Sequence, residues 1–118
     1  MGPKLERQRN ETFEVFNDIA SKYPIPEMAV VDFHMIPSAP NADWEQMATH
    51  ARARGFTVEL YDHENVPTME IRTCPLTLSA EVNWEYEERL TLLARQYGFK
   101  PDGWGFFGVS MDEDFGGV

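Results

Sequence analysis

A chain of 118 residues is long enough for one hydrophobic core and too short for two, so the length predicts a single domain over residues 1–118. The composition, with 42% hydrophobic residues, excludes wholesale disorder, and 20 Asp and Glu against 10 Lys and Arg give a net charge of -10 that makes bare nucleic acid an unfavourable partner. The chain has no run near the roughly 20 apolar residues of a membrane helix, no secretory signal and a single cysteine, Cys74, so we expect a cytoplasmic protein.

The first predicted element is a helix over residues 10–23. Asn10 is a suitable N-cap, and Pro24 ends the helix because proline cannot continue it. One side of this helix carries apolar residues at helical spacing, which predicts that it docks on a core. These residues are Phe13, Phe16, Ile19, Ala20 and Tyr23.

A strand over residues 28–36 follows, and its alternation predicts one apolar face and one mixed face that carries Asp32 and His34. Asn41 is then the predicted N-cap of a second helix, which Gly55 ends at the C′ position. The apolar strand face consists of Ala29, Val31, Phe33 and Met35, and the buried side of the helix of Trp44, Met47, Ala48 and Ala51.

The second half of the chain predicts a hairpin of two strands, over residues 56–61 and 66–74. Ser79 is the predicted N-cap of a third helix that Gly98 ends, and residues 105–109 form a last short strand. The buried side of the third helix is expected to hold Val82, Tyr86, Leu90, Leu93 and Tyr97.

After the first helix, the predicted order is strand, helix, strand, strand, helix, strand. This order is typical of a ferredoxin-like α+β sandwich, over residues 28–109, with an antiparallel four-stranded sheet and both helices on one face. The extra N-terminal helix either covers the other face or leaves it open. Residues 110–118 form a short acidic tail.

Candidate chemistry is sparse. Asp32 and His34 share a strand face, so a small-molecule site or an active site there is an alternative. The neighbouring strands can add Glu59, Tyr61, Glu70 and Arg72 to that face, and a satisfied polar sheet surface, which we favour, explains all of these residues without catalysis. The histidines are scattered and Cys74 has no partner cysteine at ligand spacing, so we predict no metal. The glycines around Trp104 precede no helix, so no phosphate-binding cofactor is expected, and the sequence predicts no catalytic residues.

Carboxylates on the third helix suggest a surface for a partner instead. Glu81, Glu85 and Glu88 lie at i, i+4 and i+7 on the side away from the apolar residues, and Glu85 can pair with Arg89. Together with Asp112, Glu113 and Asp114 of the tail, they predict a docking surface for Lys or Arg side chains.

The most distinctive stretch is Asp102-Gly103-Trp104-Gly105, and we expect its indole to form a buried corner before the last strand. The run Phe99-Lys100-Pro101-Asp102-Gly103-Trp104-Gly105, preceded by Leu92-Leu93-Ala94-Arg95-Gln96-Tyr97, resembles the C-terminal signature of the regulator of ribonuclease activity B family, which are inhibitors of ribonuclease E. The opening Gln8-Arg9-Asn10-Glu11-Thr12 is similar to the start of that family.

This resemblance implies a cytoplasmic, non-catalytic protein with a ferredoxin-like fold. It implies that the protein binds the regulatory part of a ribonuclease E-like enzyme and lowers its activity on RNA. A basic, RNA-binding segment of such an enzyme would be attracted to the acidic surface, without direct contact between this chain and nucleic acid.

Overall fold

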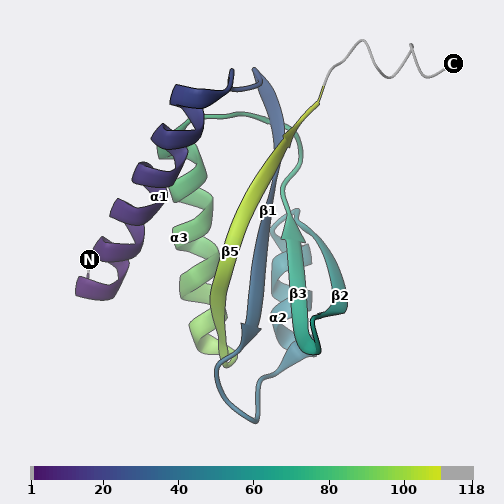
Figure 1. Cartoon of the computed structure of the whole chain (residues 1–118). Helices are drawn as coiled ribbons and strands as arrows, with labels where there is room; N and C mark the ends of the chain where they lie inside the picture. The colour runs from purple at the N-terminus through teal and green to yellow at the C-terminus, as the bar shows by residue number, and fades with distance from the viewer. Residues whose placement is uncertain (1, 110–118) are drawn as a thin grey trace, which may run out of the picture.

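The computed structural model describes residues 2–109, in which three helices combine with one antiparallel sheet (Figure 1). This combination confirms the predicted α+β class. The elements in chain order are α1 (Pro3–Lys22), β1 (Met28–Pro37), α2 (Trp44–Ala53), β2 (Thr57–His63), β3 (Val66–Arg72), β4 (Leu76–Thr77), α3 (Ala80–Gln96) and β5 (Phe99–Gly108).

β1 lies in the middle of the sheet. β5 pairs with it from Ala29 to Pro37 along one edge, while β3 and β4 share the other edge and β2 lies outside β3. All of these pairings are antiparallel. The described sheet has five strands where four were predicted, because the two residues of β4 pair with the start of β1.

The core lies between the helices and one face of the sheet. Alternate residues of β1 are at most 1% exposed, while the residues between them are half-buried. Phe16 of α1 packs against Trp104 and Phe106, which lie opposite core residues of β1, so α1 lies on the helical side, beside α3. In the described part of the chain, α1 therefore leaves the other face of the sheet open. The fully buried residues of β1 are Ala29, Val31, Phe33 and Met35.

Two predicted helix starts are wrong. α1 begins at Pro3 rather than after Asn10, with Gly2 as N-cap, because proline at the first helical position has a preset φ and needs no N–H partner. Asp43 caps α2 in place of Asn41, and its carboxylate accepts a hydrogen bond from the backbone N–H of Gln46 at 3.1 Å.

The other end signals of the helices are confirmed. The Ser79 hydroxyl accepts a hydrogen bond from the backbone N–H of Val82 at 3.1 Å, which caps α3. Gly55 and Gly98 have φ angles of +92° and +83°, which a side chain would disfavour, and they follow the last turns of α2 and α3.

The last strand begins at Phe99, not at Gly105, so Asp102-Gly103-Trp104-Gly105 lies inside β5 and the predicted corner before the strand is wrong. Phe33 lies opposite Trp104 while Met35 lies opposite Pro101, so β5 carries one extra residue over this interval. Gly103 has a φ of +111° at this bulge. The signature is therefore a β-bulge, and the first glycine supplies its backbone conformation.

Candidate functional site

The indole of Trp104 lies where β5 meets α1. It is half-buried, its ring centroid is 6.5 Å from that of Phe16, and it stacks on Phe106 at 6.3 Å with 17° between the ring planes. These contacts anchor the indole in an aromatic cluster. One side of it also lines a hollow, so Trp104 is partly a structural anchor and partly accessible.

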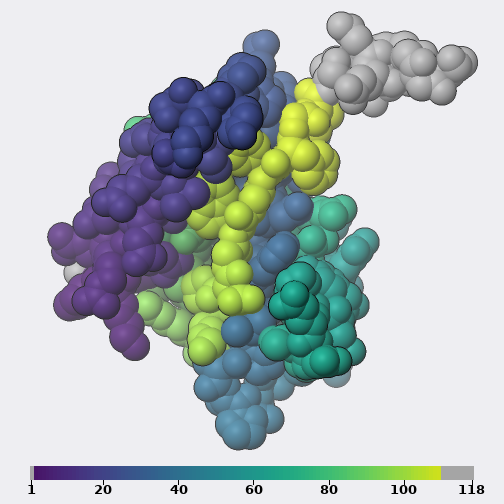
Figure 2. Space-filling view, viewed as in Figure 1, coloured from purple at the N-terminus to yellow at the C-terminus, as the bar shows by residue number. Residues whose placement is uncertain are grey.

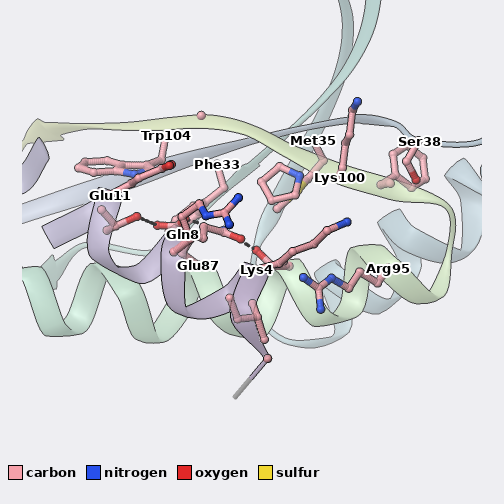
Figure 3. A pocket seen from close by; sticks show the side chains of 18 of the residues that line it. Lys4, Gln8, Glu11, Phe33, Met35, Ser38, Glu87, Arg95, Lys100 and Trp104 are labelled. Atoms are coloured by element: carbon pink, nitrogen blue, oxygen red, sulfur yellow. Dashed lines mark hydrogen bonds between the residues drawn. The ribbon is translucent and has the colours of Figure 1, made fainter. Parts of the chain in front are cut away.

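The hollow has a volume of about 950 Å³ and lies between α1, α3 and β5 (Figure 3). Phe33 and Met35 of β1 contribute to its lining, while α1 and its N-cap supply residues from Gly2 to Val15. In the space-filling view, α1 and β5 run side by side with α3 visible between them (Figure 2). The hollow is thus an elongated groove, and we call it the α1–β5 groove.

Glu87 of α3 is 4% exposed and lies in the wall of the α1–β5 groove. Its carboxylate accepts hydrogen bonds from the Thr12 hydroxyl and from the Gln8 side-chain amide, both at 2.6 Å. Burial raises the pKa of Glu87, against the lowering effect of these two hydrogen bonds. The sequence prediction missed this buried link between α1 and α3. Its signal in the sequence is that Gln8 and Thr12 are four residues apart, which puts both polar side chains on the same side of a helix.

α3 buries more than the single apolar side that was predicted, because it contacts both the sheet and α1. Leu90 and Leu93 are buried as expected, whereas Val82, Tyr86 and Tyr97 are only half-buried. The buried residues that the prediction omitted are Ala80, Asn83, Trp84, Glu87, Thr91 and Ala94.

The predicted acidic side of α3 faces solvent. Glu81 and Glu85 are exposed and Glu88 is half-buried. As expected, Glu85 pairs with Arg89, with 2.6 Å between its Oε1 and the guanidinium Nη2. The other three predicted partner-binding residues, Asp112, Glu113 and Asp114, lie outside the described residues.

The open sheet face carries a chain of ion pairs. Asp32 Oδ1 lies 2.7 Å from Arg72 Nε, and Glu70 Oε1 lies 3.0 Å from Arg72 Nη2. His34 Nε2 is 3.4 Å from the second oxygen of Glu70. The carboxylate that faces the imidazole is therefore Glu70, because Arg72 holds Asp32.

The same carboxylates act on their neighbours. Partial burial would lower the pKa of Arg72, but Asp32 and Glu70 raise it above its ordinary value. Burial raises the pKa of Tyr61, and Glu70 and Asp32 raise it further. Both shifts favour the charged guanidinium and the neutral phenol, so Arg72 is the cation that the two carboxylates share.

Neither Asp32 nor His34 lines the α1–β5 groove or the smaller hollow of about 320 Å³ near the β2–β3 hairpin. Within residues 2–109, no three His, Cys, Asp or Glu side chains are grouped so as to hold a metal ion. The helices described here are too short or too polar to cross a membrane.

The chain matches a protein family whose description is regulator of ribonuclease activity B. The match runs from residue 9 to residue 106, so it includes most of α1, Glu87 with its partner Thr12, and the bulge before Trp104. No curated protein gives a significant match. Because the family match covers most of the chain, the chain belongs to the regulator of ribonuclease activity B family.

Proposed function

We propose that this protein is a non-catalytic cytoplasmic regulator that binds a basic segment of a ribonuclease E-like enzyme and lowers its activity on RNA. The observation that carries the proposal is the family match over residues 9–106. The net charge of -10 adds a physical reason, because an excess of carboxylates attracts Lys- and Arg-rich segments that otherwise contact RNA.

Among the described residues, the outer side of α3 is the surface that we propose contacts the ribonuclease. Glu81 and Glu85 are exposed there, and a rigid helix holds them at fixed spacing. The Glu85–Arg89 pair is itself exposed, so a guanidinium from the partner can displace Arg89 at small cost. The acidic tail, Asp112 to Asp114, is the second proposed contact.

We also infer that the sheet is the core of a ferredoxin-like sandwich that forms one domain. β3 lies between β1 and β2, the two strands that α2 connects, which is the split βαβ arrangement. A rigid antiparallel sheet gives α3 a fixed support. Activity without catalysis is consistent with the open sheet face, where Asp32 and His34 contact different residues, Arg72 and Glu70.

The test is a cleavage assay with a purified ribonuclease E-like enzyme and a labelled RNA. Adding the protein should slow cleavage, the inhibition should weaken as salt rises, and the protein alone should leave the RNA intact. Cleavage that is unaffected by saturating protein would refute the proposal.

Neutralising variants locate the surface. The α3 variant should weaken inhibition about tenfold, since each exposed charge contact contributes a fraction of a kcal/mol. A control variant with the same change of charge elsewhere should retain most of the inhibition. If both lose equal activity, net charge rather than this surface is responsible. The α3 variant is Glu81→Gln, Glu85→Gln and Glu88→Gln; the control is Glu27→Gln, Glu45→Gln and Glu64→Gln.

A further inference from the structure

The α1–β5 groove has the opposite charge balance to the rest of the chain. Of the 10 Lys and Arg, four line it, whereas only two of the 20 Asp and Glu do, namely Glu11 and Glu87. All four cations are exposed, and none forms an ion pair within the described residues. A protein with a net charge of -10 thus presents a cationic groove. The four are Lys4, Arg7, Arg95 and Lys100.

The groove also has two different ends. Lys4, Arg95 and Lys100 gather at one end in Figure 3, and Trp104 lies toward the other. Val15, which is 49% exposed despite its apolar side chain, belongs to the lining, and so do the core residues Phe33 and Met35. Phe33 and Met35 are at most 1% exposed, and Met35 lies beside Lys100, so the groove offers cations at one end and an accessible indole at the other.

Its length suits an extended segment of a few residues. The lining residues of α1 span Gly2 to Val15, which is about 20 Å along a helix at 1.5 Å per residue. Five extended residues cover about 13 Å between their first and last Cα atoms. The ligand that fits this chemistry is a short acidic segment with an apolar side chain next to its carboxylates.

The chain carries such a segment outside its described residues. Residues 111–115 read Met-Asp-Glu-Asp-Phe, three carboxylates between two apolar side chains. We propose that the α1–β5 groove of one protomer binds residues 111–115 of a second copy, with the carboxylates on Arg95 and Lys100 and an apolar side chain against Trp104.

Distance disfavours the same protomer as the source. Val109 directly follows β5 and is fixed there by a hydrogen bond from its N–H to the carbonyl of Met28. Lys100 lies in β5, nine residues earlier, so its Cα atom is about 26–30 Å from that of Val109. Asp114 is five residues beyond Val109 and reaches at most about 18 Å. The Cα atom of Asp114 therefore stops at least about 8 Å short of that of Lys100, and only a fully extended tail that turns straight back along β5 would bring the two side chains together. A second copy can supply the carboxylates without this constraint.

Side chains rather than backbone pairing must provide the recognition. Pro101 has no N–H to donate, and the bulge at Gly103 interrupts the free edge of β5 beside the groove. An incoming strand would find no regular ladder there. The proposed contact is thus an electrostatic and aromatic one, and it should weaken with added salt.

The direct test uses the full chain and a fluorescein-labelled peptide of residues 109–118, Val-Ser-Met-Asp-Glu-Asp-Phe-Gly-Gly-Val, followed by fluorescence anisotropy. We expect saturable binding that is lost when the three acids of the peptide are Asn and Gln, and weakened when its Phe is Ser. Absence of binding at low salt, or equal binding of the neutral peptide, overturns the proposal.

Protein variants show where the peptide binds. Arg95→Glu with Lys100→Glu should weaken binding about tenfold or more. The control, Arg52→Glu with Arg54→Glu, reverses the same charge on exposed arginines at the end of α2, outside the groove, and should change binding less than about twofold. Urea unfolding of both variants establishes that they are folded. Equal weakening by both pairs of substitutions overturns the assignment to the groove.

Sedimentation equilibrium tests the second copy. The full chain should self-associate at concentrations above the peptide's dissociation constant, and the variant Asp112→Asn, Glu113→Gln, Asp114→Asn should not. A wild-type protein that stays monomeric at those concentrations, or an oligomer that persists in the variant, overturns a second copy as the occupant.

Discussion

Replacing Gly103 with Ala tests whether the signature is a bulge that requires glycine. The φ of +111° at this position is one that residues with a Cβ rarely adopt. A Cβ built at Gly103 meets no atom within 4 Å, so any cost comes from the backbone conformation rather than from a clash. Such strain amounts to about 1–3 kcal/mol. We expect Gly103→Ala to lower the free energy of unfolding by this amount in urea titrations.

Gly105 is the matched control, because it lies on the other side of Trp104 in the same strand. Its φ is outside the left-handed region, and a Cβ there also meets nothing within 4 Å. Gly105→Ala should be neutral or stabilise by about 0.4–1 kcal/mol, since alanine reduces the conformational entropy of the unfolded chain. The two variants should therefore differ by about 1.5–4 kcal/mol. Equal urea midpoints for the two would refute the bulge as the reason for the first glycine.

Three further predictions concern the ion pairs, the buried carboxyl and the indole. Arg72→Gln should lower the free energy of unfolding by about 1–2 kcal/mol, because it leaves two poorly exposed carboxylates facing each other, whereas Arg89→Gln should cost less than about 0.5 kcal/mol in the same urea titration. Burial raises the pKa of Glu87, so the free energy of unfolding of the wild type should fall as pH rises above the unfolded pKa of 4.5 and through the folded pKa. The difference in this free energy between the wild type and Glu87→Gln should change over the same pH range. A difference that does not depend on pH would contradict the prediction. Trp104→Ala should keep the fold but lower the free energy of unfolding by about 2 kcal/mol, which is less than the loss of a fully buried aromatic side chain costs. A near-complete loss of structure, measured by circular dichroism, would show that the indole is more deeply anchored than its contacts indicate.

Local signals in the sequence were sufficient for most of the fold. The alternation along β1 identified all four of its fully buried residues, and Ser79 and Gly98 marked the ends of α3. These predictions depend on backbone and side-chain geometry within a few residues, which a single sequence contains. The start of α1 was missed because polar residues precede Asn10, although Pro3 is itself a good first helical residue.

Features that depend on a second element could not be predicted in this way. The bulge at Gly103 exists only relative to β1, so no pattern within β5 reveals the extra residue. Glu87 occupies a helix position that reads as exposed until α1 covers it with Thr12 and Gln8. Asp32 and His34 differ from these two features, because they share a sheet face as predicted and their partners, Arg72 and Glu70 of β3, are among the residues expected on that face.

The placement of charge bears most directly on function. A net charge of -10 describes the whole chain, yet it conceals a groove in which exposed cations outnumber carboxylates by four to two. A basic partner on the outer side of α3 and an acidic segment in the α1–β5 groove would use different surfaces of α3. Because distant sites contribute nearly additively, a charge change at Glu81 should weaken the ribonuclease contact and leave peptide binding in the groove unchanged. A charge change at Lys100 should weaken peptide binding and should not weaken ribonuclease binding, since it only releases the tail carboxylates. If either substitution weakens both interactions, the two surfaces are coupled, and a single shared interface must replace two separate surfaces as the explanation of binding.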